Sequence, residues 1–305
     1  MGSIKISAVI HTYNEEKNIE RCLSSLAFVD EIVVIDMGSG DATCNIAKQF
    51  KARIYSQPYM GFADPARNFG LQKATGEWIV VVDADEEIPA TLSRYLVNLP
   101  KDSGIEFYRI PRKNIMFGKW VKHTGWWPDY QIRYFRNGAV SWTDKIHGVP
   151  LTRGRGMDLE ANENLSIVHY NYQTIEQFIE RLNRYSTISA KEIYISNQHF
   201  AYPNLLEKPV KEFINRYFVW QGYKDGIHGL GLSLLQAFSE SVVYLKLWEL
   251  ENYKEEKIHL RDFEKIISKQ FNHVRFWLVS ELLQQPHNLL NEIFWKIKKK
   301  LKFHG

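Results

Sequence analysis

Two aspartates separated by one alanine, Asp83 and Asp85, follow a run of five apolar residues and precede two glutamates. The run, residues 78–82, is rich in β-branched side chains and predicts a strand buried on both faces, as in a parallel sheet. Ligands of open α/β sheets bind beyond the carboxyl ends of such strands. Carboxylates clustered there suit a hard divalent cation such as Mg²⁺, which takes one or two carboxylates together with substrate phosphates. The alternative is that the two aspartates only begin a turn.

Polar residues also follow two predicted strands upstream. The strand over residues 5–12 runs into Thr12, Tyr13 and Glu15, and the strand over residues 31–36 ends in Asp36. Acids at these strand ends suit contacts to the ribose and base of a mononucleotide whose phosphates a metal would hold. Arg67, on the helix before the aspartate pair, is a candidate for a further nucleotide contact, with a surface ion pair as the alternative.

The elements that must position these residues alternate between strand and helix. Helices are predicted over residues 14–26, with Asn14 as N-cap, and over 41–50, 63–74 and 90–99. Short strands alternating with helices at 20- to 25-residue intervals indicate a doubly wound parallel sheet. The chain has neither G-x-G-x-x-G nor G-x-x-x-x-G-K-[ST], so a dinucleotide or P-loop site is poorly supported.

Composition narrows the class of protein. The content is 45% hydrophobic and 14% aromatic, which is ample for a core and argues against disorder. The two cysteines have no metal-type spacing and make no disulfide framework, so a cytoplasmic, reducing setting is expected. We find no signal peptide and no apolar run of about 18 residues. Residues 286–305 hold five lysines and one acid, a charge of +4, which equals the net charge of the whole chain.

At this point the chain resembles a known family. SAVIHTYNEEKNIERCLSSL, EIVVIDMGSGDAT and ARNFGLQKATGEWIVVVDADEEI are similar in order and spacing to the inverting GT-A enzymes of glycosyltransferase family 2. The resemblance implies a nucleotide-sugar donor, most often a UDP-sugar, and Mg²⁺ or Mn²⁺. It implies that Thr12, Tyr13 and Glu15 line the nucleotide pocket. It implies further that Asp36 contacts base or ribose, that Asp83 contacts the nucleotide, and that Asp85 ligates the metal.

The middle of the chain resembles a narrower group within this family, the lipopolysaccharide-core glucosyltransferase-like members. Residues 119–148 are rich in Trp, Tyr, Arg and Gly, a composition that favours a sugar-binding cleft, with a half-buried antiparallel sheet as the alternative. Many members of the group carry His-Glu where this chain has His147-Gly148. That departure matters because the glutamate is a plausible general base.

Inverting transfer is a single displacement in which a carboxylate takes the proton of the attacking hydroxyl. Asp129 and Asp144 are the candidates for this base. For each the alternative is a turn residue or an ion pair with a neighbouring Arg or Lys. His147 could replace them, or bind the metal or the diphosphate. His169, at the end of a predicted strand, is a similar candidate, and for both histidines the alternative is a structural role.

The C-terminal third is predicted to be helical. We expect a nucleotide-binding and catalytic domain over residues 1–200 and a helical region over 201–305. Leu234, Phe238 and Leu245 belong to a stripe that either packs on the catalytic domain or faces a membrane surface. Residues 289–303 set apolar side chains against lysines, which favours peripheral attachment to the inner face of the cytoplasmic membrane.

Together these features predict an α/β protein with a GT-A, Rossmann-like, doubly wound mixed sheet and a helical C-terminal region. The expected activity is metal-dependent inverting transfer of a hexose from a nucleotide-sugar to a glycan or lipid-linked acceptor, as in cell-surface polysaccharide or lipopolysaccharide synthesis. No nucleic acid partner is expected. A non-catalytic sugar-nucleotide or glycan-binding protein remains the alternative, and a nucleotidyltransferase is a third possibility that the acidic HTYNEE segment disfavours.

Overall fold

The computed structural model describes residues 5–59, 64–100, 103–142 and 150–284. The chain divides into two compact units. Unit 1 comprises residues up to 115 together with 127–171, and unit 2 comprises 116–126 together with the residues from 172 onwards. The predicted boundary near residue 200, as a division of function, stays a prediction.

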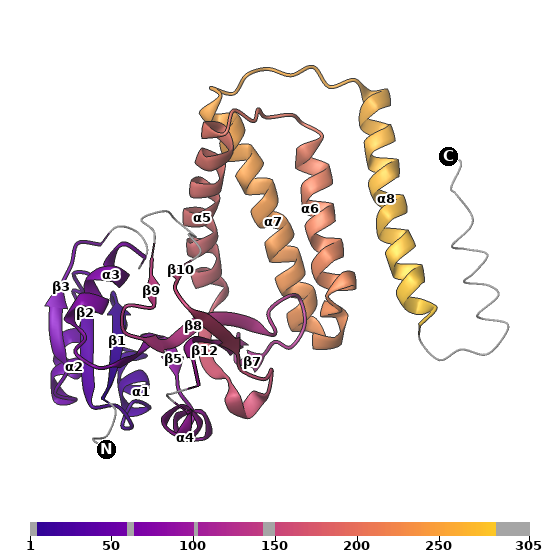
Figure 1. The fold of residues 1–305 in the computed structure, drawn as a ribbon. Helices are drawn as coiled ribbons and strands as arrows, with labels where there is room; N and C mark the ends of the chain where they lie inside the picture. Colours follow the sequence, from indigo (N-terminus) through magenta and orange to yellow (C-terminus); the bar gives the residue numbers. More distant parts are fainter. Residues whose placement is uncertain (1–4, 60–63, 101–102, 143–149, 285–305) are drawn as a thin grey trace. The chain divides into compact units, whose positions relative to one another are not determined.

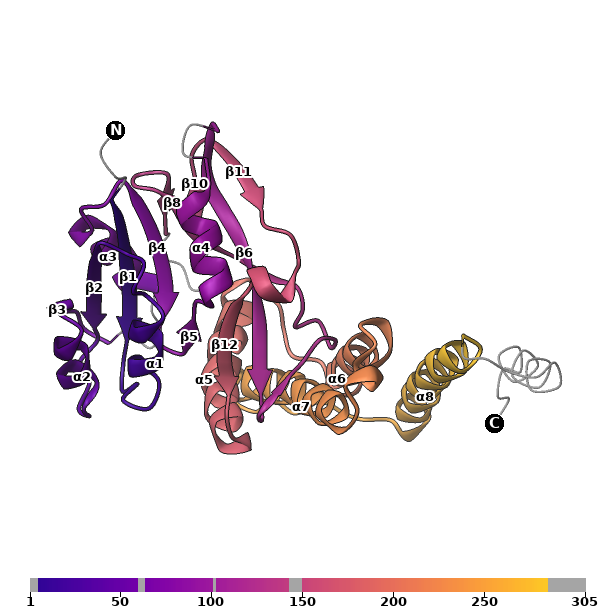
Figure 2. The ribbon, with the colours of Figure 1, turned by 90° about the horizontal axis from the view of Figure 1, so that it is seen from below.

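Unit 1 begins with a parallel half-sheet in the order β3-β2-β1-β4 (Figure 2). Its strands are β1 (Ile6–Thr12), β2 (Glu31–Asp36), β3 (Arg53–Ser56) and β4 (Trp78–Asp83). The helices between them are α1 (Ile19–Ser24), α2 (Thr43–Gln49) and α3 (Asp64–Lys73). Side chains alternate along each strand, so Ala8 and Ile10 pack with α1 while Val9 packs with α3 on the other face. Helices therefore cover both faces of the half-sheet.

The sheet continues beyond β4 as the series β8-β6-β12-β5. The strands are β5 (Glu86–Glu87), β6 (Ile105–Met116), β8 (Asp129–Arg136) and β12 (Ile167–Tyr172), and helix α4 (Ala90–Asn98) follows β5. Although β5 starts three residues after β4, it pairs with β12 at the far end of the series. The sheet therefore curls, and His169 becomes the register partner of Glu86. Short pieces complete the unit: β9 (Val140–Ser141), β10 (Leu151–Thr152), β11 (Arg155–Asp158) and a 3₁₀ turn (Glu163–Leu165).

One predicted helix start was wrong. Asn14 has a positive φ of 54°, and α1 begins only at Ile19. The cause is that the segment after β1 is tied to the loop after β2. The Asn14 amide donates to Ser39 Oγ over 2.9 Å, and the Glu15 amide donates to Thr43 Oγ1 over 2.8 Å. Because these amides bind the loop after β2, they do not begin a helix. The contact between the two loops holds the ends of β1 and β2 together.

Unit 2 is built mainly from helices: α5 (Ile175–Ile195), α6 (Asn204–Ile214), α7 (Ile227–Leu250) and α8 (Leu260–Leu282). A π-helical turn (Asn215–Val219) and a 3₁₀ turn (Gly222–Asp225) join α6 to α7, and β7 (Lys119–Trp120) lies in the inserted segment 116–126. The helices lie side by side in the order α5, α7, α6, α8, as Figures 1 and 2 both show.

The predicted fold class, a doubly wound mixed sheet with a helical C-terminal region, is confirmed. The aromatic residues Phe213, Tyr217 and Tyr223 pack on one another within unit 2, with centroid distances of 5.3 and 6.2 Å along the series. Within the part of the chain that the structure describes, no helix combines the length and apolar character needed to cross a membrane.

Candidate active site

The turn between β4 and β5 is anchored by an arginine in the interior of unit 1. Arg133, on β8, is only 3% exposed. Its guanidinium donates to Asp83 and, over 2.8 Å, to Glu86 Oε1. Glu86 is fully buried, and its other carboxylate oxygen accepts the backbone N–H of Asp83 over 2.9 Å. The two ends of the Asp83–Glu86 segment are thereby joined to each other and to the neighbouring strand.

A second arginine completes the pairing of Asp83. Arg67, on α3, lies 3.1 Å from Asp83 Oδ1, so the ion pair predicted as its alternative role exists, although Arg67 is 9% exposed rather than a surface residue. Burial opposes the charged form of Asp83, but Arg133 and Arg67 hold the pKa of this carboxyl well below its usual value. Asp83 is therefore a permanent anion that the two arginines neutralise.

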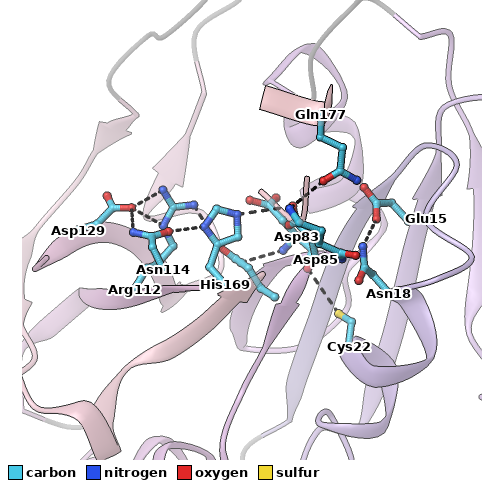
Figure 3. A network of polar contacts seen from close by, with 12 residues as sticks. Glu15, Asn18, Cys22, Asp83, Asp85, Arg112, Asn114, Asp129, His169 and Gln177 are labelled. Carbon is cyan, nitrogen blue, oxygen red and sulfur yellow. Dashed lines mark hydrogen bonds and ion pairs between the residues drawn. The ribbon is translucent and has the colours of Figure 1, made fainter. Parts of the chain in front are cut away.

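Asp85 faces a histidine from the far end of the sheet (Figure 3). Its Oδ2 lies 3.5 Å from Nε2 of His169, and both residues are buried, with exposures of 9% and 6%. The β5–β12 pairing brings them together, and the Tyr170 amide donates to the Asp85 carbonyl over 2.9 Å. This proximity could not be read from the chain order, because the two residues are 84 positions apart.

The tautomer of His169 follows from the contacts of Asn114, on β6. Asn114 Nδ2 donates to Asp129 Oδ2 over 3.2 Å. Because an ionised carboxylate only accepts hydrogen bonds, this contact turns the amide oxygen of Asn114 toward His169. That oxygen lies 2.6 Å from His169 Nδ1, so Nδ1 carries the proton. In neutral His169 the lone pair of Nε2 is therefore directed at the Asp85 carboxylate, as Figure 3 shows for the whole chain of contacts.

Two lone pairs facing each other repel unless a proton or a metal cation lies between them. Metal–ligand bonds of about 2.1 Å place neighbouring ligand atoms roughly 3.0 to 3.4 Å apart, close to the observed separation. A charge-assisted hydrogen bond would instead be about 2.7 to 2.9 Å long. No three His, Cys, Asp or Glu side chains converge on a metal position among the described residues. The pair therefore fits an ion that takes two protein ligands and completes its coordination with substrate phosphate and water.

Asp129, the first residue of β8, is held by three donors. Arg112, its register partner on β6, donates from Nε over 2.8 Å, and Gln131 Nε2 donates over 2.9 Å, in addition to Asn114. Burial raises the pKa of Asp129, but Arg112 and these hydrogen bonds outweigh it and leave the pKa lowered. A carboxylate stabilised in this way is a weak proton acceptor. These contacts match the alternative predicted for Asp129, an ion pair with a neighbouring arginine. Its role as the general base stays a prediction.

The residues predicted for the nucleotide gather at the carboxyl ends of β1 and β2. Asp36 accepts the amides of Gly38 and Ser39 over 3.2 Å, so it shapes the loop after β2. Thr12 is 2% exposed, and its hydroxyl has no hydrogen-bond partner among the described residues. Tyr13 is 37% exposed and stacks on Tyr59 with ring centroids 4.1 Å apart. Glu15 accepts from Asn18 Nδ2 over 2.8 Å.

Asp144 and His147 lie outside the described residues, so the structure does not place them. It does place residues to which the sequence assigned no role in the site: Arg133, Arg112 and Asn114. Glu86, predicted as part of the carboxylate cluster beside a ligand, is instead buried and bonded to Arg133. A signal existed for Arg133, because Gln131 and Arg133 alternate along a strand that follows the aspartate pair. His169 is among the candidates predicted from the sequence, but the sequence does not identify Asp85 as its partner.

His11, on β1, is a buried titratable group beside the site. It is the register partner of Asp83 on β4, and its Nε2 lies 3.2 Å from the Ala66 carbonyl. Burial first, and Arg67 second, lower the pKa of His11 to about 3. The folded protein therefore keeps His11 neutral at neutral and mildly acidic pH.

We predict that Arg133→Met destabilises the protein by about 3–5 kcal/mol, because Asp83 and Glu86 would keep their charges without a buried partner. The matched control is Arg109→Met. Arg109 pairs with Asp158 on the surface, with side chains 51% and 39% exposed, and such pairs contribute about 1 kcal/mol or less. Urea unfolding of the three proteins measures the difference. Equal losses for both variants would contradict the anchoring role of Arg133.

His11 predicts a pH dependence of stability. Unfolded His11 takes up a proton near pH 6.5, whereas folded His11 does so only near pH 3, so stability falls as the pH drops through this window. Between pH 7 and pH 5 the loss from this group is about 2 kcal/mol. We expect His11→Gln, which retains a donor for the Ala66 carbonyl, to lose that much less than wild type between the two pH values. Parallel urea curves at pH 7 and pH 5 provide the test, and an unchanged pH dependence in the variant would rule the assignment out.

Comparison with known proteins relates part of the chain to a family. Residues 7–155 match the family described as Glycosyl transferase family 2. An uncharacterized glycosyltransferase of Rickettsia typhi is 27% identical over 266 residues, 81% of this chain and 87% of the relative. The lipopolysaccharide core biosynthesis glycosyltransferase LpsC of Rhizobium meliloti is 25% identical over 272 residues, 85% of this chain and 95% of the relative.

Among solved structures, glucosyl-3-phosphoglycerate synthase of Mycobacterium tuberculosis, in complex with Mn²⁺, UDP and glucosyl-3-phosphoglycerate, matches locally. The identity is 29% and the TM-score 0.32, and the match covers 36% of this chain and 44% of that one, less than half of its length. The family match spans both strand ends and the Asp83–Asp85 turn described above. Residues 7–155 thus carry a glycosyltransferase family 2 domain, and over most of its length the chain is similar to proteins named glycosyltransferases.

Proposed function

We propose that this glycosyltransferase moves a hexose from a UDP-sugar to a glycan or glycolipid acceptor in a single inverting displacement that requires Mg²⁺ or Mn²⁺. The observation that carries the metal dependence is the Asp85–His169 pair with its fixed tautomer. The UDP-sugar rests on the family resemblance. The acceptor class rests on the relative from Rhizobium meliloti, whose name assigns it to lipopolysaccharide core biosynthesis.

The cation, when bound, would stabilise the charge that develops on the leaving diphosphate. Asp85 and His169 would hold it, in place of the predicted pair of Asp85 and His147. Asp83 stays fully charged between Arg133 and Arg67, so it is available to accept hydrogen bonds from donor hydroxyls. The unpartnered Thr12 hydroxyl and the exposed Tyr13 ring suit the nucleoside, together with Glu15 and Asp36.

The general base remains to be chosen between Asp129 and Asp144. The donors around Asp129 stabilise its anion and lower its pKa, so proton transfer to it is unfavourable. We therefore place Asp129 among the positioning residues, acting on His169 through Asn114, and keep Asp144 as the base candidate. Peripheral attachment through the lysine-rich residues 286–305 belongs to the same proposal, because it would bring a lipid-linked acceptor to the enzyme.

Donor binding should depend on the metal and on both ligands. We predict by calorimetry that one sugar nucleotide from a panel of UDP-, GDP- and dTDP-sugars binds more tightly with Mn²⁺ than with EDTA. Asp85→Ala and His169→Gln should each abolish that gain, whereas Asp158→Ala, which removes an exposed carboxylate of the same unit, should retain it. His147→Gln is the matched test of the other histidine.

Equal affinity for the donor in Mn²⁺ and in EDTA would contradict metal dependence. A gain lost in His147→Gln and kept in His169→Gln would restore the histidine predicted from the sequence. Turnover that survives Asp144→Asn would remove Asp144 as the base.

A further inference from the structure

The outer face of α7 is an uncovered apolar stripe. Within α7, Ile227, Leu234, Phe238 and Leu245 are 75%, 54%, 53% and 44% exposed. Two half-buried small residues, Gly231 and Ser241, lie on the same line. The six positions are then spaced alternately four and three residues apart along the helix. At 100° per residue the six positions share an arc of about 80°. We call this set the α7 stripe.

The opposite face of α7 is packed, so the stripe is not the result of a loose helix. Leu232, Val243 and Leu247 are buried there. On its flanks α7 packs against α5 and α6, as Figure 2 shows within unit 2. Lys246 Nζ donates to the Asn183 side chain of α5 over 2.7 Å. A helix with apolar residues all round is a buried helix, and here one face has no covering element among the described residues.

The stripe is self-complementary. Its residues read large, small, large, large, small, large from either end. A two-fold axis at position 236 would place Ile227 opposite Leu245, Gly231 opposite Ser241 and Leu234 opposite Phe238 of a second copy. These are the a–d layers of an antiparallel coiled coil, and a two-fold interface requires one surface that fits itself.

Charge favours the same arrangement over a lipid surface. The arc from Ile227 to Leu245 contains no Lys or Arg, and the next position on it is the exposed Glu249. An anionic bilayer would repel that end. In the antiparallel pair, Glu249 instead lies near the N-terminal end of the partner's α7. Lys224, which is exposed, precedes that end of the helix, so the two charges attract. The contact occurs twice because of the two-fold axis.

We propose that the α7 stripe is the centre of a two-fold interface between two copies of this chain, with the two α7 helices antiparallel about position 236. The sequence alone assigns this stripe either to packing on the catalytic domain or to a membrane surface. The exposure, order and charges of its residues carry the assignment to a second copy. The proposal is independent of the reaction and of the metal.

The first test is the mass of the full chain in solution. Sedimentation equilibrium at increasing protein concentration should give twice the chain mass of 35.8 kDa. Phe238→Glu should weaken the dimer on the order of a hundredfold, because it buries two unpaired charges next to the axis. Since Phe238 is half-exposed, the variant should retain the helical circular dichroism of wild type. Val97→Glu, at a 46% exposed valine of α4, is the matched control and should remain dimeric.

The second test fixes the register. In a Cys44→Ser background, Gly231→Cys and Ser241→Cys proteins should form a mixed disulfide with each other and not with themselves, because only opposed positions reach the Cα separation of about 4.4–6.8 Å that a disulfide needs. A self-crosslink at position 231 would indicate parallel helices and overturn the register.

A wild-type chain that is monomeric at all concentrations would overturn the proposal. So would a monomer that binds phosphatidylglycerol vesicles and loses this binding in Phe238→Glu, which would assign the stripe to a bilayer. A dimer that Phe238→Glu leaves intact would place the interface elsewhere.

Discussion

The guanidinium of Arg133, held in the interior between Asp83 and Glu86, is the contact on which the rest of the site depends. Burying three charges contributes little net stability compared with an apolar core, but removing one partner leaves the others uncompensated. The arrangement therefore serves position more than stability. It joins β8 to both ends of the Asp83–Glu86 segment, and the segment in turn sets where Asp85 lies. Arg67 forms a second ion pair with the Asp83 carboxylate.

The curl of the sheet brings a second residue to the anchored Asp83–Glu86 segment. Because β5 pairs with β12, a histidine from a distant part of the chain arrives beside Asp85. A series of contacts orients that histidine. Arg112 holds Asp129, Asp129 orients the amide of Asn114, and Asn114 fixes the proton on His169 Nδ1. Removing hydrogen bonds that orient a metal-binding histidine commonly changes metal affinity by about 10–100-fold. We therefore propose that Asp129 contributes to the site through the histidine and not through proton transfer.

Much of unit 1 was predictable because its signals are local. Apolar runs such as residues 78–82 predicted buried strands, and the acids that follow them predicted which edge holds the site. The helix start at Asn14 failed, because the amides of Asn14 and Glu15 bind a loop that is distant in sequence. The pairing of His169 with Asp85 was beyond prediction for the same reason: it depends on the curl of the sheet. Likewise, the α7 stripe was visible as a pattern, but only the fold shows which side of the helix is covered.

The central claim is that the contacts of Asp129 and Asn114 direct the Nε2 lone pair of His169 at Asp85. The most direct measurement is ¹⁵N–¹H NMR of the histidine rings of the metal-free protein at pH 8, where ordinary histidines are neutral. His169→Gln identifies the signal. The account predicts the Nδ1–H tautomer for His169, a shift of the Nε2 signal on addition of Zn²⁺ or Cd²⁺, and loss of the single tautomer in Asp129→Leu. An Nε2–H tautomer that persists in both proteins would mean that His169 only donates a hydrogen bond to Asp85, and it would contradict the proposed metal position.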